Sequence, residues 1–117
     1  MATADPDLRG ADRVREVFAR VRRGDASVAD LYTEDGVIVY GHGDGDRVEG
    51  REAIRAFYQG TIDAIRPQPT VEAVLEAPPM FVALVDVPTA DQHHRALDLF
   101  ELDDTGIRRL EIFTRAG

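Results

Sequence analysis

Asp98 is the residue whose type and surroundings most strongly suggest chemistry. It lies in the middle of an apolar run at residues 96–100, which has the composition of a buried β-strand. A carboxylate on an apolar face is costly unless it is paired, hydrogen-bonded or neutral, so its pKa is expected to rise. A raised pKa is common among catalytic acids and bases. Asp98 is therefore a candidate acid or base, and the alternative is a structural aspartate satisfied by an arginine, a histidine or backbone N–H groups.

Tyr40 and His42 are the second and third candidates. Tyr40 is expected to share a strand face with Ile38 and His42. A phenol with an ordinary pKa of about 10 cannot shuttle protons near neutral pH, but it can donate a hydrogen bond to a carbonyl. His42 lies in a loop of glycines and aspartates, and an imidazole titrates near neutrality, so it could act as a base. The alternatives are that Tyr40 is a plain pocket wall and that His42 has no role.

The remaining polar patterns give little support to a metal or a cofactor. His94 is expected on the Asp98 face, but four residues of strand separate the two by about 13 Å. The spacing His42-x-Asp44-x-Asp46 lacks the other ligands of a calcium loop. The glycines at 41, 43 and 45 follow a strand without opening a helix, so they are no dinucleotide-binding fingerprint. We therefore expect no metal and no cofactor.

The elements that must position these residues can be predicted from hydrophobic periodicity. Apolar residues three and four apart predict a helix over 11–21, which could start at Asp5 or Asp7. A short helix over 26–31 and a third helix after Gly50, stopped at Pro67, are also expected. Strands are predicted at 36–40, around Val48, and at 70–76, 80–87, 94–102 and 107–114. This order predicts an α+β fold whose antiparallel sheet ends in a four-strand meander.

Length and composition narrow the class of protein further. The chain has 117 residues, 44% of them hydrophobic, which suits one domain spanning 1–117. It has no cysteine for a disulfide or a thiolate site, and no apolar run long enough to cross a membrane. All 14 basic residues are arginine, yet the net charge is −8, which disfavours nucleic acid and anionic lipid as partners. A cytoplasmic location is the default expectation.

Three stretches carry a resemblance to a known superfamily. They are residues 31–39 (LYTEDGVIV), 48–58 (VEGREAIRAFY) and 102–107 (LDDTGI). Together with the order of elements they resemble the nuclear transport factor 2-like (NTF2-like) superfamily, close to its SnoaL-like and ketosteroid-isomerase-like branches, from about Leu8 to Arg115. The resemblance implies a cystatin-like cone with about three N-terminal helices packed on a strongly curved antiparallel sheet. It also implies a blind apolar pocket and homodimers that pair through the convex sheet face.

The resemblance also implies a function and a set of site residues. The ligand would be a small apolar, polyketide-like or steroid-like molecule, and the reaction an isomerisation, cyclisation or dehydration that uses Asp98 as acid or base. Asp98 falls where ketosteroid isomerases carry the protonated aspartate of their oxyanion hole. Tyr40 stands where they carry the general base, and Phe18 roughly where they carry a tyrosine. The implied pocket is lined by Phe18, Ile38, Phe57, Tyr58 and Phe100.

Two alternatives remain open at this point. Limonene-epoxide-hydrolase-like relatives use an aspartate–arginine–aspartate set, but Ala96 occupies the place of the arginine and the face of Glu111 is unresolved. The other alternative is a non-catalytic dimeric binding or interaction module of the same fold. Its contact face would be the convex one, with Arg95, Leu97, Leu99, Glu101 and Phe113.

Overall fold

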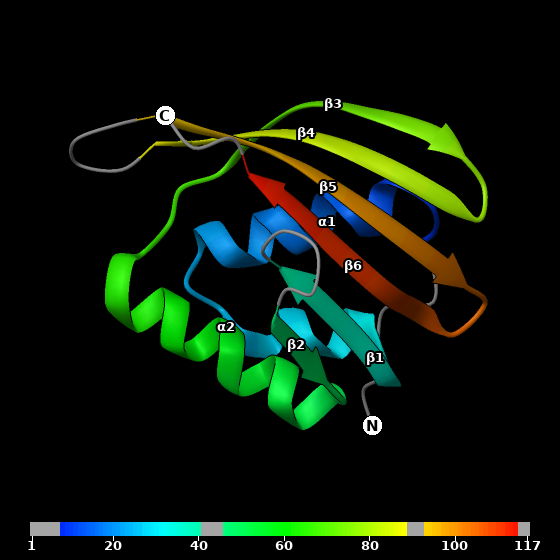
Figure 1. Ribbon diagram of the computed structural model, residues 1–117, viewed down its shortest axis with the longest axis horizontal. Coiled ribbons are helices and arrows are strands. Elements are labelled where there is room, and N and C mark those ends of the chain that lie inside the picture. The colour runs from blue at the N-terminus through cyan, green and yellow to red at the C-terminus, as the bar shows by residue number, and fades with distance from the viewer. Residues whose placement is uncertain (1–7, 41–45, 89–92, 115–117) are drawn as a thin grey trace.

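Three helices lie against a strongly curved six-stranded sheet in the computed structural model, which describes residues 8–40, 46–88 and 93–114 (Figure 1). None of the helices in this described part is long and apolar enough to span a bilayer. The elements in chain order are α1 (Ala11–Arg22), the short 3-10 helix η1 (Ala26–Leu31), β1 (Tyr32–Tyr40), β2 (Asp46–Glu49), α2 (Arg51–Ile65), β3 (Thr70–Ala77), β4 (Met80–Pro88), β5 (His93–Asp103) and β6 (Gly106–Thr114).

The sheet is mixed rather than wholly antiparallel. Its strand order is β2-β1-β6-β5-β4-β3, so the predicted meander of β3 to β6 is present and β2 pairs back onto β1. However, β1 and β6 run parallel, with Tyr32 beside Ile107 and Tyr40 beside Ile112. The prediction of an antiparallel sheet is wrong at this pair. A parallel pair needs a long crossover between its strands, and α2 with β3 to β5 supplies it.

Two glycines explain where the predicted boundaries shift. The first helix begins at Ala11, directly after Gly10, whose φ of 53° suits glycine. It does not begin at Asp5 or Asp7, which lie outside the described residues. Strand β1 begins at Tyr32, four residues earlier than expected, because Gly36 lies within the strand. A Cβ at Gly36 would approach the carbonyl oxygens of Thr33 and Ile107 to 3.1 and 3.2 Å, so the glycine permits a close backbone contact there.

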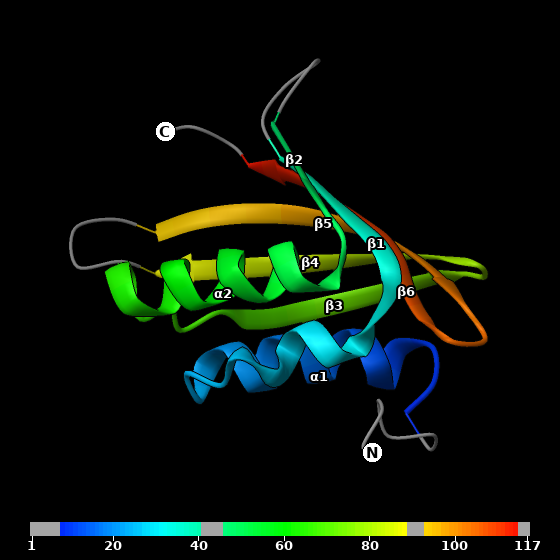
Figure 2. The ribbon, with the colours of Figure 1, turned by 90° about the horizontal axis from the view of Figure 1, so that it is seen from below.

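The helices cover the concave face of the sheet. Figure 2 shows α1 and α2 lying across that face, with β1 and β6 curving around one end. Helix α1 packs on β3 and β4, while α2 packs on β1 and β2. The buried core combines the apolar stripes of the helices with the inner faces of the strands, including Val14, Phe18, Ile54, Ile38, Phe81 and Phe100. The apolar stripes predicted from periodicity are buried for the most part, but Ile65 at the end of α2, predicted in such a stripe, is 60% exposed.

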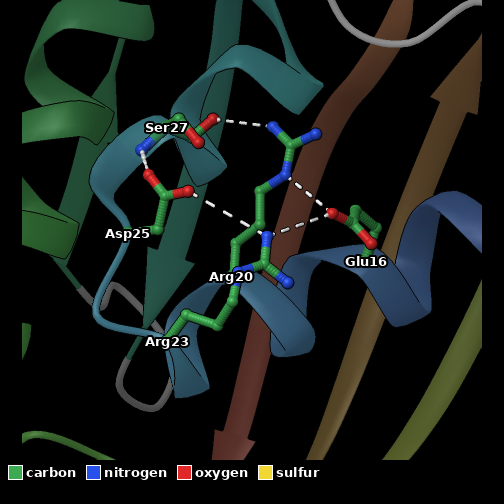
Figure 3. Close-up of polar contacts among 5 residues, drawn as sticks. All are labelled: Glu16, Arg20, Arg23, Asp25 and Ser27. Atoms are coloured by element: carbon green, nitrogen blue, oxygen red, sulfur yellow. Dashed lines mark hydrogen bonds and ion pairs between the residues drawn. The ribbon is translucent and has the colours of Figure 1, made fainter.

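A group of polar contacts fixes the turn between α1 and η1, as Figure 3 shows. Asp25 caps η1 by accepting a hydrogen bond from the Ser27 N–H at 2.9 Å. Arg20 donates to the Glu16 carboxylate at 2.9 Å and to the Ser27 carbonyl at 3.2 Å. Arg23 adds a longer contact of 3.5 Å to Glu16. These contacts hold η1 in place, and η1 leads directly into Tyr32 at the start of β1.

Candidate functional site

Asp98 lies on the inner face of β5, as strand alternation predicts. Its neighbours across the sheet are Ala83 on β4 and Ile112 on β6. The residue is only 6% exposed, and its Oδ1 atom is buried without a hydrogen-bond partner. Burial raises the pKa of the carboxyl group to about 7, because the apolar surroundings disfavour its charged form. Within the described part of the chain, no arginine or histidine forms an ion pair with Asp98.

A pair of buried tyrosines accompanies this carboxyl group. The Tyr32 and Tyr58 hydroxyl oxygens are 2.6 Å apart in a hydrogen bond in which either group can be the donor. Burial raises the pKa of both phenols. The negative charge of Asp98 raises the pKa of each phenol further. The interior of the fold thus gathers three ionisable groups that all favour their neutral forms.

Tyr32 is the residue that sequence reasoning missed. Tyr58 was predicted only as part of an apolar pocket wall, although its hydroxyl belongs to the polar pair. Tyr32 was assigned no role because it stands at the end of η1, well before the predicted strand. A tyrosine with its hydroxyl in an apolar core needs a polar partner, which is a signal that could have prompted the search for a second one.

Tyr40 is set apart from Asp98. Both face the inside of the sheet, but Ile112 on β6 stands between them. Two strand spacings separate the backbones of the two residues by about 10 Å. The Tyr40 ring instead packs on Phe57 with 5.3 Å between the ring centroids, and both residues are half-buried. His42, the other predicted catalytic residue, lies outside the described residues.

The residues predicted to line the pocket differ in how deeply they are buried. Ile38 and Phe100 are fully buried, and Phe18 meets Phe100 edge to face with 6.0 Å between centroids. These three side chains belong to the buried core. Phe57 is more open, beside Tyr40. Of the three hollows outlined among the described residues, none is lined by Asp98.

The epoxide-hydrolase-like arrangement does not assemble. Glu111 pairs with Leu99 in the sheet and lies 3.4 Å from Arg109, on the outer face and away from Asp98. Ala96 stands on the inner face where that mechanism would need an arginine. His94 pairs with Val87 near the start of β5, at the opposite end of that strand from the β5–β6 turn. Asp98, Tyr32 and Tyr58 are therefore the polar groups that the fold brings together.

The arrangement of helices and curved sheet is the NTF2-like fold. A candidate ketosteroid isomerase from Kribbella flavida matches with a TM-score of 0.81 and 21% identity over 90% of this chain and 76% of that one. A candidate SnoaL-like polyketide cyclase from Jannaschia matches at 0.75, with 19% identity over 89% and 83% of the two chains. An NTF2-like protein of unknown function from Cytophaga hutchinsonii matches at 0.77, with 14% identity over 93% and 92%.

These likenesses define the fold of the chain. No protein-family model matches the sequence. No curated protein matches it either. The structural neighbours confirm the predicted resemblance to NTF2-like, SnoaL-like and ketosteroid-isomerase-like proteins at the level of the fold. Function has to be argued from the residues around Asp98.

Proposed function

We propose that the chain binds a small apolar carbonyl compound between its helices and the inner face of the sheet, and that Asp98 exchanges a proton with it. The observation that carries this proposal is a buried carboxyl group with an unsatisfied oxygen, whose charge raises the pKa of two buried, hydrogen-bonded tyrosines. A carboxyl group with a pKa of about 7 is well matched to general acid–base catalysis at neutral pH. A polyketide-like or steroid-like ketone suits the apolar surroundings.

The chemistry follows from the two kinds of polar group. Ionised Asp98 removes a proton from a carbon next to the carbonyl, and the electron pair of that C–H bond moves onto the carbonyl oxygen. A hydroxyl of the Tyr32–Tyr58 pair donates to this oxygen, because each phenol carries one hydrogen and only one is used within the pair. Protonated Asp98 then returns the proton to another atom of the ligand. Isomerisation, aldol-type cyclisation and dehydration all share this first step.

Ligand access is best supported at the Tyr40 end of β1. Tyr40, Phe57 and Ile112 are half-buried there, whereas Ile38 and Phe100 are sealed in the core. The Tyr40 and Phe57 rings would form the mouth of the site and move apart to admit a flat apolar molecule. In this role Tyr40 is a pocket wall, and no proton transfer is assigned to it.

Solvent deuterium exchange tests the proton transfer directly. We expect the protein to accelerate deuterium uptake next to the carbonyl of cyclic ketones in D2O, measured by NMR across a panel that includes steroid and polyketide ketones. Asp98→Asn removes the base and should reduce the acceleration at least about 100-fold, because general bases contribute that much or more. Tyr58→Phe removes one hydroxyl and should reduce it less.

Glu111→Gln is the matched control, because Glu111 lies on the outer face of the same sheet. The Glu111→Gln variant should accelerate deuterium uptake by the ketone as much as the unchanged protein does. Exchange that survives Asp98→Asn, or that never exceeds the buffer rate with any ketone that binds, would remove Asp98 from the chemistry.

We propose a second candidate role, a dimeric binding module, because large apolar side chains are exposed on the outer face of the sheet. Leu75, Leu97 and Phe113 are 58%, 40% and 40% exposed. Leu97 lies beside Leu84 and Phe113 in adjacent strands, so these side chains form one continuous apolar surface. Exposed apolar patches of this kind often mark protein–protein contacts. A second copy of the chain is the partner that the resemblance favours.

A charge at the centre of this surface tests that pairing. We expect Leu97→Arg to convert a dimer into a monomer in analytical ultracentrifugation, because a buried unpaired guanidinium would oppose the contact. The control is Leu75→Arg, at the edge of the surface on β3, which should weaken the dimer less. Circular dichroism should show both variants folded. A protein that is monomeric without any substitution would exclude this role.

A further inference from the structure

Arg13 is a buried cation whose guanidinium group is only partly satisfied by hydrogen bonds. It is 6% exposed, and its Nε–H donates to the Leu8 carbonyl at 3.0 Å, but its Nη1 is buried and has no hydrogen-bond partner. Among the described residues no carboxylate lies within ion-pair distance of it. Burial lowers the pKa of the guanidinium, and the charge of Asp103 only partly offsets this. An unpaired guanidinium is among the costliest groups to bury, which points to a missing anionic partner.

Arg13 lines a hollow with a volume of about 1100 Å³. The hollow lies where α1 begins, between the β3–β4 turn and the β5–β6 turn. The Leu102 N–H donates to the Pro79 carbonyl at 2.9 Å, which holds the two turns side by side. Gly10 precedes α1 and offers no side-chain cap, so the positive end of this twelve-residue helix also borders the hollow.

Two further guanidinium groups border the same space. Arg51 is fixed in position because its Nε and Nη2 both donate to the Tyr32 carbonyl, at 3.1 and 2.7 Å. Arg9 is exposed and also lines the hollow. Phe81 and Leu102 supply an apolar wall. The lining of the hollow thus includes both guanidinium groups and hydrocarbon surface.

We infer that this hollow binds a small organic monocarboxylate with an apolar body, whose carboxylate is the missing partner of Arg13. The apolar body would cover Phe81 and Leu102. Carboxylates also line the hollow, and their negative charge repels a more highly charged anion. Asp30 is neutralised by Arg55 at 2.6 Å and Asp103 lies 3.8 Å from Arg108, but Glu34 and Asp104 remain close by. A single negative charge suits this surrounding better than the double charge of a phosphate.

The inferred site is separate from the Asp98 site. Leu102 lies four residues beyond Asp98 on β5, about 13 Å along the strand. The Phe18 and Phe100 rings pack edge to face between the two regions. A ligand could therefore occupy either site without touching the other, and each proposal can fail alone.

Hexanoate is a suitable probe, with 1-hexanol and inorganic phosphate as comparisons, added to the full chain with amide shifts followed by NMR. We expect hexanoate to shift the amides of Gly10, Thr105 and Gly106 in a saturable way. Hexanol and phosphate should shift them little. Arg13→Gln should weaken hexanoate binding at least about tenfold, since a charge-assisted hydrogen bond contributes that much. Arg9→Gln should weaken hexanoate binding about threefold. This second variant tests the inference if the Arg13→Gln protein does not fold.

Arg95→Gln is the matched control, because Arg95 is exposed and pairs with Glu72 on the outer face of the sheet. It should bind hexanoate like the unchanged protein. Equal binding of hexanol and hexanoate, or binding unaffected by either Arg13→Gln or Arg9→Gln, would overturn the inference. Shifts confined to Asp98 and Ile112 would also overturn it, while leaving the proposal for Asp98 intact.

Discussion

Replacing Asp98 with asparagine is expected to raise the free energy of unfolding by about 4 kcal/mol at pH values above about 8, and to change it little at about pH 4. The reason is the difference between the two states of the chain. The pKa of Asp98 is about 7 when folded and close to 4 when unfolded. Asparagine keeps the shape of the neutral acid but cannot ionise.

The direction of this effect depends on which state holds the proton. Below about pH 4 both states are protonated, so the carboxyl group costs the fold nothing. Between about pH 4 and pH 7 the unfolded chain has released the proton and the folded chain still holds it, so rising pH favours unfolding. Above the folded pKa of about 7 both states are ionised, and the full cost remains.

Urea unfolding at a series of pH values measures the effect. The difference between the unchanged protein and Asp98→Asn should grow from about pH 4 to pH 7 and then level off. The unfolding free energy of Glu111→Gln, on the outer face of the sheet, should change with pH in the same way as that of the unchanged protein. If the unfolding free energies of Asp98→Asn and the unchanged protein show the same pH dependence, the carboxyl group is solvated or paired in solution.

Gly106→Ala is expected to lower the free energy of unfolding by about 3 kcal/mol. Gly106 begins β6 with a φ of 152°, a conformation that residues with a side chain rarely adopt. A Cβ there would lie 2.8 Å from the Leu31 carbonyl oxygen and 3.1 Å from Arg13 Nη1. The first of these contacts is with backbone, so β1 and β6 would have to move apart.

Thermal unfolding measures the loss, and Gly60→Ala is the control. Gly60 lies inside α2, and a Cβ there meets nothing within 4 Å. This second substitution should stabilise the protein by up to about 1 kcal/mol, because alanine favours the helix. If the same glycine-to-alanine substitution destabilises the protein at position 106 and stabilises it at position 60, the loss at 106 comes from the contact with Leu31. A neutral Gly106→Ala variant would show that the junction of β1 and β6 can relax.

The sequence predicted the elements better than it predicted their pairing. Helix and strand periods identified α1, α2 and the meander because each has one apolar face, and the inward direction of Asp98 followed from simple alternation. The parallel contact of β1 with β6 was missed because it depends on a crossover of most of the chain. No local pattern encodes it.

The candidate site was predicted in part for the same reason. Asp98 was found because a carboxylate interrupts an apolar strand, which is visible in the sequence. The Tyr32–Tyr58 contact joins the start of β1 to the middle of α2, and only the packing of α2 on β1 creates it. Whether Tyr40 donates to a ligand carbonyl or only forms a pocket wall stays a prediction, and its position two strands from Asp98 follows from the pairing of β1 with β6.

The parallel contact between β1 and β6 also constrains how the chain folds. The hairpins from β3 to β6 join neighbours in sequence, so they can form early at a small loss of entropy. Joining Tyr32 to Ile107 closes a loop that contains most of the protein, which is a slow event in proteins rich in distant contacts. Until it happens, β1 and the helix α2 that packs on it cannot close the interior in which Asp98 is buried. We therefore expect Asp98 to lose its water only in the last stage of folding.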